Sequence, residues 1–466
     1  MHDDLNAVLV RLEADRVGAV ERLCDFLRIP SISADPGYTQ EVARCAQWAC
    51  DQLRSAGLNA SVRKAKGHPM VVATHEGPPG YDGPRLLYYG HYDVQPPDPI
   101  ELWKSGPFEP VIVDGPRGKR IVARGAVDDK GQVMSFIEAF RAWIKVHGTL
   151  PCAVTVLLEG EEECGSVSLE PFLLENRNEL KADACIVSDT GMWDVETPAI
   201  TTALRGLVYV EVTVHGPERD LHSGQYGGAV PNPINVLCSI IAQLHDGDRR
   251  VMLDGFYERV EEVSPRVRQQ WRELGLSESE FMESIGLTES FGEKGFSALE
   301  RTWSRPTCDV NGIFGGYTGT GAKTVIASHA TAKISFRLVA SQDPAKVLES
   351  IQAFVTARLP AGCRMEMTEF GANPAFLVAD GSVFLGAAER ALAAVYQRAP
   401  VLIGSGGSIP AVGAISRILS TPALLVGFGL DDDCVHSPNE KMEMACFEGA
   451  QRSHAAILHE IGRMRV

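Results

Sequence analysis

Histidine and carboxylate side chains follow four short apolar runs of the chain, at the points where buried strands would end. The runs are Leu86–Tyr89, Ala153–Leu158, Ala184–Val187 and Ala423–Phe428. The polar groups that follow them are His91 with Asp93, the acidic stretch Glu159–Glu163, Asp189, and the stretch Asp431–His436. Carboxylates crowded together repel one another or take up protons, and a bound cation removes that conflict. The pattern therefore predicts a metal site, although each residue alone has a simpler explanation as a core histidine or a solvated acidic loop.

A fifth group consists of the adjacent residues Asp128 and Asp129, which precede a predicted helix over Gln132–Trp143. Aspartates in this place commonly cap the helix N-terminus, and taken alone we favour the cap. Beside two histidines and two further acidic clusters, a carboxylate that bridges two metal ions explains the pattern better.

The sequence pattern around these groups is typical of an α/β domain that carries an insertion. Apolar runs between helical stretches predict buried strands of a mostly parallel sheet, and the carboxyl ends of such strands meet at one edge, where sites form. From about Leu204 the pattern changes to alternating strands at 208–214 and 333–338, each with one polar face. We therefore predict a catalytic α/β domain over 1–203 and 374–466, interrupted by a smaller α+β domain over 204–373.

Composition excludes several classes of function. The chain has 466 residues, 45% of them hydrophobic, and a formal net charge of −16, so nucleic acid and membrane surfaces are poor partners. Its eleven cysteines are odd in number and scattered, which favours free thiols in a reducing compartment. The first residues carry no basic segment followed by an apolar core. We therefore expect a cytoplasmic protein.

Six ordered motifs resemble the carnosinase-like dipeptidases. These dipeptidases belong to the dinuclear-metal amidohydrolases, with carboxypeptidase G, aminoacylase and succinyl-diaminopimelate desuccinylase. The motifs are Gly90–Pro96, Arg124–Gly131, Glu159–Ser166, Asp220–Gly224, Gly406–Pro410 and His436–Glu440. The resemblance extends from about residue 20 to the C-terminus. It implies a mixed, mostly parallel sheet between helices, as in zinc exopeptidases, with the inserted domain serving as a lid and for dimerisation.

The resemblance also implies the ligands of two divalent metal ions. One ion would be bound by His91 and Asp189, the other by Glu163 and His436, with Asp128 bridging the two. This set of nitrogen and oxygen donors suits zinc, with manganese or cobalt as alternatives. The resemblance further implies a cis peptide bond after Asp128.

Two acidic residues receive supporting and catalytic roles on the same basis. Glu162 is expected to be the general base that activates a water molecule and returns the proton to the leaving amine. Asp93 is expected to orient the ring of His91, although an acid so placed could also bind metal directly.

Three further residues are assigned to the substrate by the resemblance. His222 would donate to the tetrahedral oxyanion from the partner subunit of a homodimer. Arg337 and Ser408 would bind a substrate carboxylate. From the residues alone, two less favoured alternatives stay open, which are that His222 is a polar loop histidine and that Arg337 is an ordinary exposed strand residue.

The predicted function is hydrolysis of the amide bond of a dipeptide. Two alternatives stay open, which are an amidohydrolase of N-acyl or N-carbamoyl amino acids and a non-catalytic binding protein that has kept the fold. The second alternative is weak because every metal ligand and Glu162 are retained. Where many dipeptidases of this family carry Arg-Glu, this chain has Gly404 and Ser405, which leaves substrate preference open.

Overall fold

The computed structural model describes residues 3–378, 381–407 and 409–465, and the chain divides into two compact units. Unit 1 comprises Met1–Thr202, Val378–Ile403 and Pro410–Val466. Unit 2 comprises Ala203–Leu377 and the short segment Gly404–Ile409. None of the helices among the described residues combines the length and the apolar character that crossing a membrane requires.

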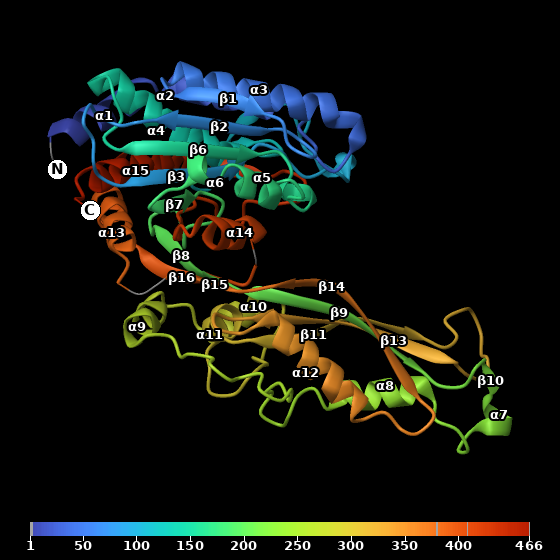
Figure 1. The fold of residues 1–466 in the computed structure, drawn as a ribbon. Helices are drawn as coiled ribbons and strands as arrows, with labels where there is room; N and C mark the ends of the chain where they lie inside the picture. The colour runs from blue at the N-terminus through green and yellow to red at the C-terminus, as the bar shows by residue number, and fades with distance from the viewer. Residues whose placement is uncertain (1–2, 379–380, 408, 466) are drawn as a thin grey trace. The chain divides into compact units, whose positions relative to one another are not determined.

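Unit 1 is built on a mixed sheet whose central strands are parallel (Figure 1). Strands β6, β3, β7 and β17 pair in parallel, whereas β1, β2 and β8 join through antiparallel pairs. In spatial order the strands are β1 (Asn59–Arg63), β2 (Met70–His75), β6 (Ala153–Glu159), β3 (Arg85–His91), β7 (Ala184–Val187), β17 (Ala423–Leu425), β8 (Ala199–Leu204) and β15 (Phe376–Leu377), with β16 (Val401–Ser405) beside β8. Three of the four apolar runs lie wholly within β3, β6 and β7, and the first half of the fourth run, Ala423–Phe428, forms β17.

Helices flank the sheet, and unit 1 also contains a second sheet of three strands. The helices of unit 1 are α1 (Asp3–Ala14), α2 (Arg16–Leu27), α3 (Thr39–Ser55), α4 (Lys130–His147), α5 (Leu169–Glu175), α6 (Arg177–Leu180), α13 (Val383–Tyr396), α14 (Pro410–Leu419) and α15 (Met444–Gly462). Helix α4 packs on α15 and α1, and α15 also packs on α13. The second sheet has the order β18 (Lys441–Glu443), β5 (Gly118–Val122), β4 (Val111–Gly115).

Helix α3 shows how the sequence determines an element of this unit. Its buried residues recur with helical spacing and face β1 and β2. Gly57 follows the helix with φ +101°, a conformation that glycine adopts without the steric cost of a side chain. The amide of Gly57 donates to the carbonyl of Arg54, and that of Leu58 to Leu53, so the last carbonyls of the helix are satisfied.

Unit 2 contains a four-stranded antiparallel sheet that is covered on one face. The sheet has the order β11 (Thr307–Gly315), β13 (His329–Leu338), β9 (Gly206–His215), β14 (Arg364–Asn373). Helices α8 (Pro233–Ala242) and α12 (Pro344–Thr356) pack on β9 and its neighbours and close a core with the buried valines of β9 (Figure 1). Alternate residues of β9 and β13 are only partly buried, so the opposite face is open.

The remaining elements of unit 2 are short. They are β10 (Leu221–His222), β12 (Val325–Ile326), α7 (Ser223–Tyr226), α9 (Pro265–Glu273), α10 (Glu278–Glu283) and α11 (Ala298–Trp303). Helices α10 and α11 each begin with a capping box, in which the first serine and a glutamate three residues later bond each other's backbone amides.

Candidate metal centre

Two groups of potential ligands meet at Asp128 in unit 1. His91, Asp128 and Asp189 form one group, and Asp128, Glu163 and His436 form the other. Within each group, one ligand atom of every residue lies within 4.8 Å of the others. The structure therefore brings together all five residues that were expected to bind metal.

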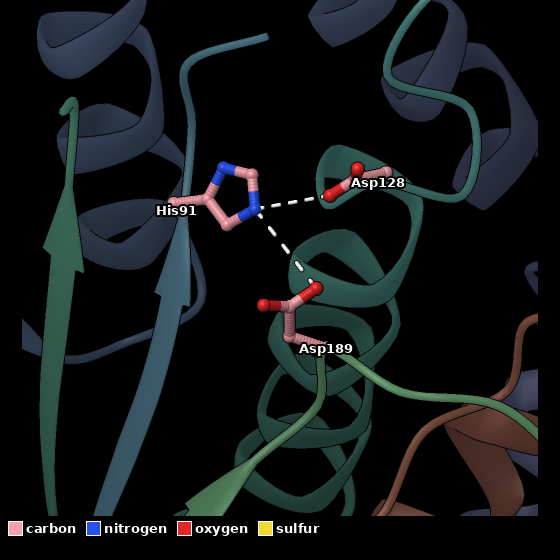
Figure 2. Close-up of side chains that lie close together, drawn as sticks. All are labelled: His91, Asp128 and Asp189. Carbon is pink, nitrogen blue, oxygen red and sulfur yellow. Dashed lines mark hydrogen bonds and ion pairs between the residues drawn. The ribbon is translucent and has the colours of Figure 1, made fainter. Parts of the chain in front are cut away.

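Asp128 offers one carboxylate oxygen to each histidine. His91 Nε2 lies 3.1 Å from Asp128 Oδ1 and 4.0 Å from Asp189 Oδ1, and Figure 2 shows all three side chains pointing toward one another. On the other side, His436 Nε2 lies 2.9 Å from Asp128 Oδ2 and 3.2 Å from Glu163 Oε2. A carboxylate whose two oxygens serve two separate donor sets has the geometry of a bridging ligand.

The strand ends of unit 1 place these residues. His91 is the last residue of β3, Asp189 follows β7 by two residues, and Glu163 lies in a short 3₁₀ helix after β6. His436 belongs to the loop between β17 and β18, and Asp128 precedes α4. Because β6, β3, β7 and β17 are parallel, their carboxyl ends lie at one edge of the sheet.

Asp93 connects the ring of His91 to the loop that carries Glu162. His91 Nδ1 lies 3.2 Å from the backbone carbonyl oxygen of Asp93 and 3.4 Å from Oδ1 of the Asp93 side chain. The Asp93 carboxylate also accepts hydrogen bonds from the amides of Glu162 and Glu163, at 3.3 and 3.1 Å. With Nδ1 engaged in this way, Nε2 of His91 faces Asp128 and Asp189.

Asp129 occupies the N-cap position of α4 but does not act as a cap. Its side chain makes no hydrogen bond to the first turn of the helix. Oδ2 instead accepts a hydrogen bond from the His91 amide at 3.1 Å, and the peptide bond between Asp128 and Asp129 is cis, as the resemblance implied. The cap alternative is therefore wrong for Asp129, which fixes the backbone of a candidate ligand.

Glu440 is a buried carboxylate that the sequence analysis left without a role. Its Oε2 accepts from Arg124 Nη1 at 2.7 Å and from the Gly125 amide at 2.9 Å. Its Oε1 accepts from the amides of Val127 and Asp128 at 3.0 and 3.1 Å. Because Glu440 follows His436 by four residues, one carboxylate ties together the loops that carry both residues. The signal was present in the motif His436–Glu440, of which only the histidine was given a function.

Gln95 and Asp433, to which no individual role was assigned from the sequence, hold the same loops. Gln95 Nε2 donates to Glu163 Oε2 at 2.9 Å. Asp433 is fully buried, accepts from the Leu430 amide at 2.7 Å and forms an ion pair with Lys441. The alternative that Asp431–Asp433 is a solvated loop is thus wrong for Asp433, although it holds for the exposed Asp431.

The electrostatics of the five residues suit a divalent cation. Hydrogen bonds to Asp128 and Glu163 raise the pKa of His436 to about 10. Burial works against charge on His91, yet the carboxylates of Asp128 and Asp93 raise its pKa well above its ordinary value. Burial, together with the charges of Asp128 and Glu162, raises the pKa of Asp189. The cluster thus retains protons to balance its carboxylates, and nitrogen and carboxylate donors exchange such protons for metal. The residues present fit two metal ions.

Glu162 lies among these groups without belonging to either ligand group. Burial raises the pKa of its carboxyl, and the negative charges of Glu163, Asp128 and Asp93 act in the same direction, whereas His91 opposes them. A carboxyl whose pKa is shifted toward neutrality is suited to take up and release a proton.

The three residues expected to contact substrate belong to or border unit 2. His222 is exposed at the end of β10, where its Nδ1 accepts from the Gly224 amide at 3.0 Å. An imidazole that accepts at Nδ1 carries its proton at Nε2 and can donate there. Arg337 is partly buried on the open face of β13. Ser408 lies outside the described residues.

Comparisons with known proteins agree with this geometry. The family model described as "Peptidase family M20/M25/M40" matches residues 87–460. The chain is 29% identical to the Cys-Gly metallodipeptidase DUG1 of Saccharomyces cerevisiae, covering 98% of both chains, and 27% identical to the Beta-Ala-His dipeptidase of Rattus norvegicus, covering 96% of this chain and 93% of that one.

A solved structure extends the agreement to the fold. The metallo-carboxypeptidase Sso-CP2 of Sulfolobus solfataricus superposes with a TM-score of 0.80 at 32% identity, covering 96% of this chain and 99% of that one. The chain belongs to peptidase family M20/M25/M40 and is a hydrolase that acts on peptide bonds.

Proposed function

We propose that this protein is a dinuclear metallodipeptidase that hydrolyses the peptide bond of a dipeptide. The observation that carries the proposal is the pair of ligand groups that share Asp128, with Glu162 beside them. The similarity to a Cys-Gly dipeptidase and a Beta-Ala-His dipeptidase along nearly the whole chain supports a dipeptide as substrate.

His91 and Asp189 hold one metal ion in this proposal, Glu163 and His436 hold the other, and Asp128 bridges them. Two histidine nitrogens and three carboxylates suit zinc, with manganese and cobalt as alternatives. When bound, such ions polarise a carbonyl group and lower the pKa of water from near 16 toward about 7.

Glu162 acts as the general base and then as the general acid. It takes a proton from the attacking water and returns it to the amine that leaves, which splits the peptide bond without net consumption of a proton. The Asp93 carboxylate accepts a hydrogen bond from the backbone amide of Glu162, so the same carboxylate that supports His91 also holds the base in place.

The substrate is held by residues of unit 2 in the proposed mechanism. Arg337 presents a planar guanidinium, which binds a carboxylate through two parallel hydrogen bonds. Ser408 adds a hydrogen bond to that carboxylate. His222 donates from Nε2 to the oxygen that becomes negative in the transition state.

We further propose that the protein is a homodimer in which unit 2 supplies the contact and the partner's His222 completes the site. Strand β11 is the terminal strand of its sheet and exposes Val310, Ile313 and Phe314. An edge strand with exposed apolar side chains is characteristic of an interaction surface. Light scattering that finds only monomers would remove this part of the proposal.

We propose that the protein resides in the cytoplasm, because its free thiols are typical of a reducing compartment. All eleven cysteines are free, and six of them are buried at 45, 50, 152, 185, 308 and 446. Proteins of oxidising compartments more often pair such residues.

The test is an activity panel in which dipeptides are compared with N-acetyl and N-carbamoyl amino acids. We expect turnover of dipeptides, loss of all measurable turnover after treatment with a chelator, and recovery on addition of zinc, manganese or cobalt. Metal analysis of the purified protein should find about two equivalents. A preference for N-acyl amino acids would replace the dipeptidase by the amidohydrolase, and turnover that survives complete metal removal would refute both.

A further inference from the structure

Arg205 and Arg337 lie at the same end of the unit 2 sheet. Arg337 on β13 pairs directly with Leu207 on β9, and Arg205 precedes Leu207 by two residues. Side chains two apart along a strand share a face, as do directly paired residues of neighbouring strands. Leu207 and Arg337 are therefore on the open face, where both are only partly buried, and Arg205 directly precedes the strand β9 that carries Leu207.

The guanidinium of Arg205 uses few of its five donors. Nη1 lies 3.5 Å from the carbonyl oxygen of Arg301, at the end of α11. Nε is buried and has no hydrogen-bond partner among the described residues. A buried donor without a partner has lost its hydration without compensation. A ligand that places an acceptor beside Arg205 would therefore lower the free energy of this side chain.

The segment next to Arg205 supplies no negative charge. The Arg205 amide donates to the Ser405 carbonyl at 3.3 Å, and Nη2 lies 3.2 Å from the point that a Cβ at Gly406 would occupy. Ser405 is neutral, and its Oγ accepts from the Gly407 amide at 3.2 Å. The guanidinium thus lies against a glycine backbone, where a side chain would crowd it.

No carboxylate among the described residues forms an ion pair with Arg205 or Arg337. Burial and then the positive charge of Arg337 lower the pKa of Arg205 to about 10, and the negative charge of Asp309 offsets only part of this shift. Two neighbouring guanidinium groups that repel each other, in a place partly shielded from water, create a positive potential that an anion would relieve.

We propose that Arg205 is a specificity-determining residue that binds the side-chain carboxylate of the substrate, so that the enzyme prefers dipeptides with a C-terminal aspartate or glutamate. The inference rests on the proposed function, in which Arg337 holds the main-chain carboxylate of the same residue. A C-terminal acidic residue carries two carboxylates on one short frame, which matches two adjacent guanidinium groups in number and in charge.

Glycyl-glutamate and glycyl-glutamine test the proposal, because they differ in charge but hardly in shape. We expect wild-type kcat/KM to favour Gly-Glu by about tenfold or more, since hydrogen bonds to a charged group are the strong class. Arg205→Met should bring the ratio of the two kcat/KM values close to one. Arg205→Lys, which retains the charge but not the planar fork, should give an intermediate ratio.

Lys333→Met is the matched control, because Lys333 is a cation on the same face of β13. Its removal should leave the Gly-Glu to Gly-Gln ratio at the wild-type value. Equal wild-type rates on the two dipeptides would overturn the role of Arg205 while leaving the dipeptidase intact, and so would an Arg205→Met variant that loses both activities in proportion. Failure to hydrolyse any dipeptide would overturn the inference and the proposed function together.

Discussion

The loops of the candidate metal centre and the open face of the unit 2 sheet both concentrate charged side chains, but they satisfy those charges differently. In the metal centre, Arg124 pairs with Glu440 and Lys441 with Asp433, and all four side chains are almost completely buried. At the open face, by contrast, neither Arg337 nor the neighbouring Arg205 forms an ion pair with a carboxylate among the described residues.

The difference separates two uses of charge. A buried ion pair costs desolvation of both groups, and removing one member leaves the other uncompensated. Such pairs therefore fix a geometry, here that of the loops bearing Asp128 and His436. A partly buried cation without a partner in the protein is available to bind an anionic group of a ligand. Variants of the first kind should alter metal binding, and variants of the second kind should alter substrate choice.

The largest expected effect lies in the metal centre but outside its ligands. Glu162→Gln retains the shape of the side chain and removes its basicity, so kcat should fall by about 10²- to 10⁴-fold. Metal content, measured by mass spectrometry, should remain at the wild-type value. The control is Glu175→Gln. Glu175 is an exposed glutamate at the end of α5, and this variant should behave as wild type. Substantial turnover by Glu162→Gln would remove this residue from the mechanism.

Glu440→Gln should have the next largest effect, and it tests whether the buried pairs act through geometry. An amide nitrogen cannot accept a hydrogen bond, so two of the four donors around Glu440 lose their acceptor and Arg124 loses its counter-charge. We expect metal affinity to fall by about 10- to 100-fold and the free energy of unfolding to fall by about 3 kcal/mol.

The control for Glu440→Gln is Glu460→Gln, which breaks a surface pair with Arg390. Exposed pairs contribute roughly 0–1 kcal/mol, so urea unfolding and metal titration should hardly change. If Glu440→Gln bound metal as tightly as wild type, the loop-fixing role assigned to the buried pair would be refuted, whatever happened to stability.

Much of the fold was predictable because its signals are local. The helix predicted over Gln132–Trp143 lies within α4, and the buried residues of α3 recur with the spacing of a helix, which is visible in the sequence itself. The buried strands were predicted from short apolar runs, and the histidine and carboxylate residues that follow these runs do come together in the candidate metal centre. The antiparallel strands β1 and β2 give a weaker signal in the sequence, because most residues of β1 and the last two residues of β2 are not fully buried.

The parts that sequence did not predict depend on contacts between distant residues. Glu440 and Arg124 are 316 positions apart, and no spacing rule connects them. The segment Gly404–Ile409 groups with unit 2 although it lies between two stretches of unit 1, which only the tertiary contacts reveal. Asp433 looked like part of a solvated acidic run because its partner Lys441 is brought to it by folding.

Arg337→Met should have the smallest effect of these three variants and tests the open face directly. If Arg337 binds the C-terminal carboxylate, its loss should raise KM for a dipeptide by about tenfold or more while kcat changes little, because such binding is shared by ground state and transition state. A dipeptide amide lacks that carboxylate, so the variant and the wild type should hydrolyse it with similar kcat/KM. Metal content should be unaffected, in contrast to Glu440→Gln. Should Arg337→Met instead reduce turnover of the dipeptide and its amide equally, Arg337 would be an ordinary residue of the strand, and the division between geometry-fixing and ligand-binding charges would fail for unit 2.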